Sequence, residues 1–149
     1  MASSQLNAIF DAIAGWDVYY DSDVNVKIRE LQNQASVIKT MEGMVRNIVL
    51  GDGGGRFVAM GKTLAIDWEI VDTLYLRPTS HLGNIRVATP QLANYIVNYI
   101  DAIQADRSPT NQSHIESFAP EIGSESYPVG GDEEWFIARI TLTVREFIS

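Results

Sequence analysis

The stretch TLAIDWEIVDTLYLR, residues 63–77, contains neither Gly nor Pro, and its large apolar side chains share one parity. This apolar set consists of Leu64, Ile66, Trp68, Ile70, Leu74 and Leu76. A period of two predicts one long strand that buries a single face. At about 3.3 Å per residue the strand would run about 50 Å, whereas a compact chain of this length is only about 40 Å across. We therefore expect it to bend at the polar break, Asp72, and beyond this bend to extend past its own core as a ribbon.

The beginning of the chain predicts one helix. Its apolar residues at helical spacing are Leu6, Ile9, Phe10 and Ile13. Ser3 or Ser4 can cap this helix, and Gly15 stands where a C-terminal cap belongs. Trp16–Tyr20 is then expected to form a short strand, and the polar segment Asp21–Gln34 a loop or a short helical piece.

The segment before the long ribbon has the pattern of a β-hairpin. Met44–Leu50 predicts a strand, Gly51–Gly55 a glycine-rich turn, and Phe57–Met60 leads into the ribbon. Pro78 is expected to end the ribbon, because proline cannot donate to a strand ladder.

Downstream of the ribbon, Thr89 and Pro90 form an N-cap and first-turn pair for a second helix. One face of that helix carries Leu92, Tyr95, Ile96, Tyr99, Ile100 and Ile103. Ala105–Glu134 is rich in Pro and Gly and predicts mainly loop, within which His114–Phe118 can form a short strand. A second long ribbon closes the chain, with an apolar face of Phe136, Ala138, Ile140, Leu142, Val144 and Ile148. The order predicts an α+β fold: a largely antiparallel sheet of long strands with two main helices packed on one face.

The composition indicates one domain spanning residues 1–149. Of the 149 residues, 46% are hydrophobic and none is Cys, so we expect a core without disulfides or thiolate metal sites, as suits a reducing cytoplasm. The opening MASSQLNAIF has no basic segment followed by an apolar run, and no run of about eighteen apolar residues occurs, so we expect a soluble, unsecreted protein.

The formal net charge is −8, with only 11 scattered Lys and Arg residues. Wrapping of DNA requires clustered basic residues that neutralise phosphates, so the charge argues against that activity. An acidic surface repels a polyanion instead, which suits a wall past which DNA must slide.

Two glycine-rich or acidic segments resemble known ligand loops but do not fit them. Gly51–Gly55 and the GKT at 61–63 suggest a phosphate loop, yet the glycine spacing is wrong and a strand-like run follows where a helix is needed. Asp21, Asp23 and Asn25 begin like a calcium loop, but Val26 and Gln32 replace its essential Gly and Glu. We interpret the first as a hairpin turn and the second as a solvated loop.

His114 and Glu116 share a face of their expected strand, a pair that suits a metal or a general base, and His81 is the only other histidine. The acidic run at 132–134 is interpreted as solvated surface, and Tyr95 with Tyr99 as core packing rather than a stacking platform. No pattern anchors a nucleophile, a zinc protease or a dinucleotide site, so we assign no catalytic, cofactor or metal residue and expect no enzyme.

The arrangement resembles the tail terminator family of long-tailed bacteriophages. The pieces that carry the resemblance are LNAIFDAI (6–13), MVRNIVLGDGG (44–54), LAIDWEIVDTLYLRP (64–78), TPQLANYIVNYIDAI (89–103) and ARITLTVREFI (138–148). The resemblance implies a homo-oligomeric ring, hexameric in this family, at the head-proximal end of the tail. Such a ring stops tube polymerisation and joins the tail tube protein to the neck or connector, while DNA passes only through its lumen.

On this resemblance the chain would be a virion component assembled in the host cytoplasm, with heterologous contacts between neighbouring copies. The ribbon 63–77 and the loop 78–87 would supply much of the interface. The residues expected to contribute to it are Trp68, Glu69, Asp72, Tyr75, Arg77, Pro78, His81, Arg86, Arg139 and Arg145.

The polar segment Asp21–Gln34 is longer than this resemblance leads one to expect, which leaves open a sister role as a head-tail connector, tail-completion protein or tube subunit. Two other classes also stay open. One is a small α+β enzyme or ligand-binding domain that uses His114, Glu116 or the glycine turn. The other is an acidic modulator that mimics DNA and binds a basic partner.

Overall fold

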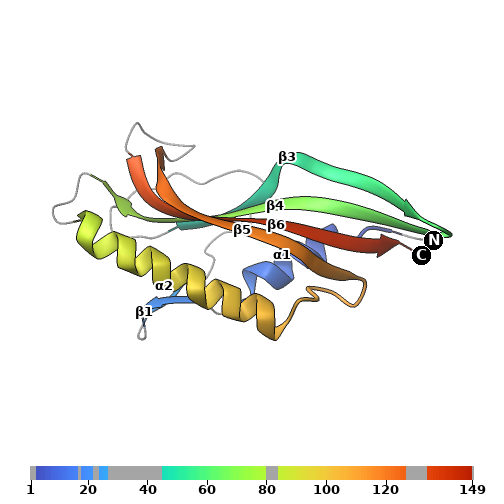
Figure 1. Cartoon of the computed structure of the whole chain (residues 1–149), viewed down its shortest axis with the longest axis horizontal. Coiled ribbons are helices and arrows are strands. Elements are labelled where there is room, and N and C mark those ends of the chain that lie inside the picture. The colour runs from blue at the N-terminus through green and yellow to red at the C-terminus, as the bar shows by residue number, and fades with distance from the viewer. Residues whose placement is uncertain are drawn as a thin grey trace.

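The computed structural model describes residues 3–16, 18–21, 24–26, 45–79, 84–126 and 134–148, and it has an α+β fold (Figure 1). Its elements, in chain order, are α1 (Leu6–Ala14), β1 (Val18–Asp21), β2 (Val24–Val26), β3 (Val45–Met60), β4 (Thr63–Pro78), α2 (Asn84–Ala105), β5 (Ser113–Ser126) and β6 (Glu134–Ile148). The predicted fold class is therefore confirmed.

Strands β3, β4, β6 and β5 form, in that spatial order, an antiparallel four-stranded sheet, so β3 and β5 are its edges. Strands β1 and β2 form a separate antiparallel pair, and β1 contacts α2. Figure 1 shows both helices and β1 on the same side of the large sheet. In the part of the chain that the structure describes, neither helix is both long and apolar enough to cross a membrane.

The core lies between this sheet and the two helices. Its buried members from the helices are Ile9, Phe10, Ile13, Ala88, Leu92, Tyr95, Tyr99 and Ile103, and those from the sheet are Ile48, Ile70, Leu74, Leu76, Ile115, Ala138, Ile140, Leu142 and Val144. The sheet members of β4 and β6 are all even-numbered, because alternate side chains of a strand point to opposite faces. The inward parity predicted for both ribbons is thus confirmed.

The glycine-rich segment is not the hairpin turn that the sequence predicted. Strand β3 continues through it, and the turn lies instead at Gly61 and Lys62, where Gly61 has a φ of 64°. Gly51–Gly54 form a bulge, since Leu50 pairs with Ile70 while Gly55 already pairs with Trp68. Bulges of this kind bend a strand and change which of its residues face the core.

The bend expected at Asp72 is also wrong. Asp72 pairs in regular register with Ile48 on β3 and with Ile140 on β6, and it lies inside the core. A carboxylate that is paired with a cation can be buried within a regular strand. The prediction of a bend took Asp72 to be an exposed polar interruption of the apolar face. The shifts of β4 register lie opposite the β3 bulge and between Tyr75 and Arg77.

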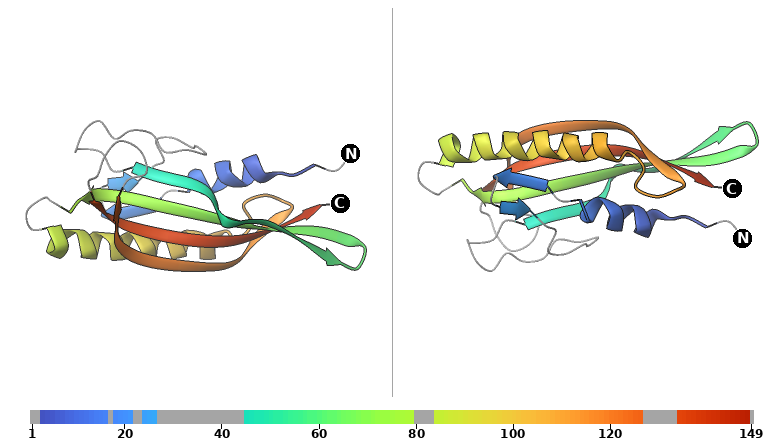
Figure 2. Two further views of the ribbon diagram at one scale, coloured as in Figure 1. Left: turned by 90° about the horizontal axis from the view of Figure 1, so that it is seen from above. Right: turned by 90° about the horizontal axis from the view of Figure 1, so that it is seen from below.

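Beyond the bulge, the tip of the β3–β4 hairpin runs past the ends of both helices (Figures 1 and 2). Strand β6 reaches Leu64 with its residue Ile148, and β5 reaches no further than the level of Ile66, through the pair Ser113 and Glu146. A ribbon therefore overhangs the helices, but at the Thr63 end of the predicted strand and not beyond Asp72, where Leu74 and Leu76 are buried. We call residues 55–64 the arm.

Both helices begin differently from the prediction. Gln5, not Ser3 or Ser4, is the N-cap of α1, although the Ser4 Oγ accepts a hydrogen bond of 3.1 Å from the Leu6 N–H. Helix α2 starts at Asn84, so Pro90 lies inside it rather than in its first turn. The predicted apolar face of α2 is nevertheless buried, because it is set by helical period and not by the start.

Two segments predicted as loop contain strands. Residues 24–26, inside the expected loop 21–34, form β2, and residues 113–126 form the whole of β5, well beyond the short strand allowed at 114–118. Strand β5 tolerates Pro120 because it is an edge strand, where a missing N–H can face solvent. Asp132 and Glu133 of the acidic run, and most of 21–34, lie outside the described residues.

We predict that Gly55→Ala destabilises the fold by about 1–3 kcal/mol, the usual cost of overpacking. A Cβ at Gly55 would lie 2.5 Å from the Trp68 Cζ3, so the indole would have to move. Gly123→Ala in β5 is the matched control, because its Cβ would meet no heavy atom within 4 Å. Urea unfolding midpoints measure both, and equal midpoints would contradict the prediction.

Candidate assembly surface

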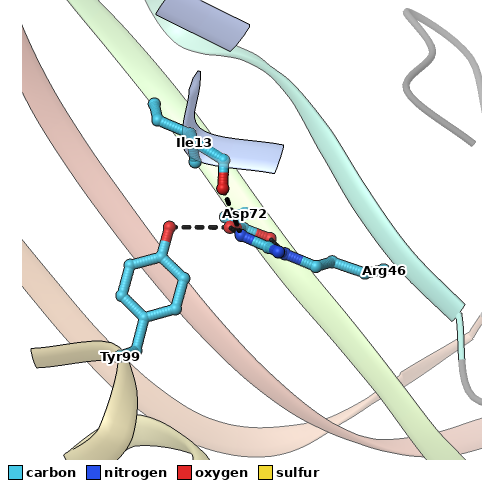
Figure 3. Close-up of polar contacts among 4 residues, drawn as sticks. All are labelled: Ile13, Arg46, Asp72 and Tyr99. Carbon is cyan, nitrogen blue, oxygen red and sulfur yellow. Dashed lines mark hydrogen bonds and ion pairs between the residues drawn. The ribbon is translucent and has the colours of Figure 1, made fainter. Parts of the chain in front are cut away.

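A buried ion pair connects four elements of the fold (Figure 3). The guanidinium of Arg46 on β3 donates two hydrogen bonds of 3.0 and 2.6 Å to the two carboxylate oxygens of Asp72 on β4. The Tyr99 hydroxyl on α2 donates to the same carboxylate at 2.6 Å, and Arg46 Nη2 also donates to the Ile13 carbonyl of α1 at 3.1 Å. One charged pair thereby fixes both helices to the two strands of the hairpin.

The side chains of Arg46 and Asp72 are both fully buried. Burial by itself lowers the pKa of Arg46, but the charge and hydrogen bonds of Asp72 outweigh it and raise that pKa well above its ordinary value. Burial also raises the pKa values of Tyr95 and Tyr99. All three side chains therefore keep their protons throughout the physiological pH range.

A second buried carboxylate holds the other end of α1. Glu146 of β6 is fully buried, and its Oε1 accepts hydrogen bonds from the Ser4 hydroxyl at 2.9 Å and from the Trp68 Nε1 at 3.0 Å. Its Oε2 accepts from the backbone N–H of Gln5, the N-cap of α1. A negative charge at a helix N-terminus interacts favourably with the helix dipole.

Helix α1 therefore receives both of its terminal charges from the sheet. It has no acidic residue in its first turn and no basic residue in its last. Glu146 supplies the anion at its N-terminus, and Arg46 supplies the cation at the carbonyl of Ile13, near its C-terminus. These two contacts fix where the helix lies along the sheet, and so where the helical cover ends.

On the face of the sheet without helices, two arginines of β6 form ion pairs with four carboxylates. Arg145 binds Asp67 through contacts of 2.7 and 3.0 Å and lies 3.5 Å from Glu116. Arg139 binds Glu121 at 2.8 Å and also Glu125. Hydrogen bonding to Arg145 lowers the pKa of Asp67 despite partial burial. Among the described residues at the β5 edge of this face, carboxylates outnumber arginines.

The arm presents apolar side chains to solvent. Phe57 is 67% exposed and Leu64 40% exposed. Phe57 pairs across the hairpin with Ile66, so it lies on the face that the helices cover elsewhere in the sheet. The arm therefore continues the apolar face of the sheet beyond the end of its helical cover.

The structure distributes the predicted interface residues over several environments. Trp68 is half-buried over Gly55, Tyr75 is buried and donates to Glu125 at 2.8 Å, and Asp72 lies inside the core. Glu69 accepts a 2.7 Å hydrogen bond from the Gly53 N–H and so fastens the bulge. The remaining placements are Arg86, exposed on α2; Arg139 and Arg145, ion-paired on β6; Arg77 and Pro78, with their backbone in β4; and His81, outside the described residues.

Asp72 cannot contribute to an interface from this position, because its carboxylate is enclosed by Arg46 and Tyr99. His114 and Glu116, the pair considered for a metal or a general base, do lie close together: the His114 Nε2 is 2.6 Å from the Glu116 Oε1. Glu116 also lies near Arg145, which makes the pair part of the surface ion network. Within the described ranges, no three acidic, His or Cys side chains gather as metal ligands would.

Sequence reasoning missed Arg46, Glu146, Phe57 and the acidic edge strand β5. Parity alone could have identified Glu146, since its position is even-numbered, like those of the inward residues of its ribbon. Arg46 likewise shares parity with the buried Ile48. Phe57 had no such signal, because the bulge between Leu50 and Gly55 changes the inward parity of β3.

Comparison of the sequence with protein-family models finds no match, and comparison with curated proteins finds none either.

We predict that Asp72→Ala costs about 3–5 kcal/mol of unfolding free energy, because it leaves the buried Arg46 guanidinium without its counter-charge. Glu121→Ala is the control: it also removes the partner of an arginine, but the Glu121 side chain is 59% exposed. Its cost should not exceed about 1 kcal/mol. Chemical denaturation of both variants measures the difference, and similar losses would contradict a special role for the buried pair.

Asp67 should make part of the free energy of unfolding depend on pH in the acidic range. Its folded pKa lies below its unfolded value, so the stabilisation is present above the unfolded pKa, about 4, and is lost as the pH falls through the folded pKa. We predict that Asp67→Asn is less stable than the parent chain at neutral pH and loses less stability on acidification. Urea midpoints measured between pH 7 and pH 2 test this, and parallel curves would refute it.

Proposed function

We propose that this chain is a virion structural protein that caps the head-proximal end of a phage tail tube as a homo-oligomeric ring. In this role it ends tube polymerisation and joins the tail to the neck or connector, and DNA passes through the lumen. The observation that carries the proposal is the arm, whose apolar side chains lie beyond the helical cover that buries the rest of that face.

Two further features support an assembly role. The arm belongs to a long two-stranded hairpin whose base is anchored in the core by Arg46 and Asp72. The chain carries a net charge of −8, which disfavours adhesion of DNA to the protein in a lumen. Ring closure also needs no catalytic group, only complementary surfaces on one chain.

We predict that Phe57→Ser abolishes self-association while leaving the fold intact. Phe57 is 67% exposed in the isolated chain, so its replacement removes little from the core but removes an apolar anchor from the contact. Val97→Ser is the matched control, because Val97 is 58% exposed on α2, away from the arm. Native mass spectrometry and electron microscopy should show annuli for the parent chain and for Val97→Ser, and monomers for Phe57→Ser.

Capping is tested separately from association. Added to polymerising tube protein of the same virus, the parent chain should shorten the tubes as its proportion rises, and Phe57→Ser should not. Tubes that instead incorporate the chain along their length would favour a tube subunit. A chain that stays monomeric with and without tube protein would remove the basis of the proposal.

A further inference from the structure

The arm and the strand β5 carry opposite charges. Between Gly55 and Leu64 the sequence contains Arg56 and Lys62 and no acidic residue. Strand β5, residues 113–126, contains three glutamates and neither Lys nor Arg. Both surfaces are accessible, since Arg56 and Lys62 are exposed and the Glu121 side chain is 59% exposed.

Each of these surfaces also has an exposed apolar residue. Phe57 and Leu64 lie on the arm, and Ile122 of β5 is 44% exposed beside Glu121. The other exposed large apolar residues among those described are Leu50, at the bulge, and Val97, on α2. An apolar centre with a charged rim on both sides is the usual composition of a specific contact.

The two surfaces lie at opposite edges of the sheet. The arm includes the end of the edge strand β3 and projects from one end of the sheet (Figure 2), and β5 is the other edge strand. A contact between opposite edges of two copies is heterologous, so each end copy still offers one free surface, and the chain of contacts closes into a ring when the rotation between copies divides a full turn. A symmetric contact of arm with arm is disfavoured, because it would bring Arg56 and Lys62 of both copies together.

We infer that the arm of one copy docks on the β5 edge of the next copy, with Phe57 and Leu64 against Ile122 and with Arg56 and Lys62 against the β5 glutamates. This inference rests on the proposed ring function and names the contact that closes the ring. The three β5 glutamates share Arg139 and Arg145, and Arg145 also binds Asp67, so the β5 edge retains the negative charge that attracts the arm.

The contact is one of side chains and not a continuation of the sheet. Pro120 lies in the middle of β5, which is an edge strand, and a proline nitrogen has no hydrogen to donate. Edge strands tolerate proline where its nitrogen faces away from the neighbouring strand. An uninterrupted backbone ladder along this edge is therefore blocked. The charges make the association dependent on salt, and reversing both basic residues, Arg56→Glu with Lys62→Glu, should weaken it about tenfold, since exposed ion pairs contribute modestly.

The absence of Cys from the chain permits a direct test by cross-linking. Ala59→Cys places a thiol on the arm and Ser124→Cys places one on β5, both at exposed positions that leave the proposed charges in place. With a short bis-maleimide, the double variant should give a ladder of covalent oligomers, whereas a mixture of the two single variants should give only dimers. The control pair joins Ala59→Cys to Asn94→Cys, at an exposed position of α2.

The outcomes separate this inference from the proposed function. Cross-links through Ser124→Cys and not through Asn94→Cys support arm-to-edge docking. Annuli that cross-link only through Asn94→Cys, or through neither pair, overturn the docking site while the ring function stands. A parent chain that remains monomeric, without annuli or cross-links, overturns both.

Discussion

The buried pair of Arg46 and Asp72 is the interaction on which the rest of the structure depends. A guanidinium and a carboxylate can enter a core only together, because either one alone carries a large desolvation cost. Their hydrogen bonds reach the Ile13 carbonyl and the Tyr99 hydroxyl, so the pair fixes the positions of two helices against two strands. The contribution of such a pair is specificity of arrangement, since apolar residues could have filled the same volume.

Glu146 completes this arrangement at the opposite end of α1. The short helix has no charged residues of its own at the positions that complement its dipole, and the sheet provides an anion and a cation at the proper ends. The position of α1 along the sheet is thus determined electrostatically as well as by apolar packing. Because the helix ends where it does, the hairpin tip is left without cover, and the exposure of Phe57 follows from the same contacts.

The two faces of the sheet use charge differently. On the helix side, the charged groups described are few and enclosed: Arg46 pairs with Asp72, and Glu146 accepts hydrogen bonds from Ser4, Gln5 and Trp68. On the other side, Arg139 and Arg145 are shared among more numerous carboxylates, which leaves an acidic edge at β5. The basic arm at the far edge complements that surface. Charge separation between the two edges of one sheet gives each copy two different and complementary ends, which is what a head-to-tail ring requires.

The sequence by itself determined the α+β class, the long strands 63–78 and 134–148 with their inward parity, and the buried face of α2, because periodicity records which side of an element meets the core. It did not locate the bulge at Gly51–Gly54, the strand around Pro120 or the buried position of Asp72. Those features depend on partners distant in the chain. Pro120 is tolerated because β5 is an edge strand, and the Asp72 carboxylate can be buried because Arg46 of β3 pairs with it. Only the tertiary structure could decide where the helical cover stops and which apolar residues remain exposed, because that boundary is set by contacts between elements and not within them.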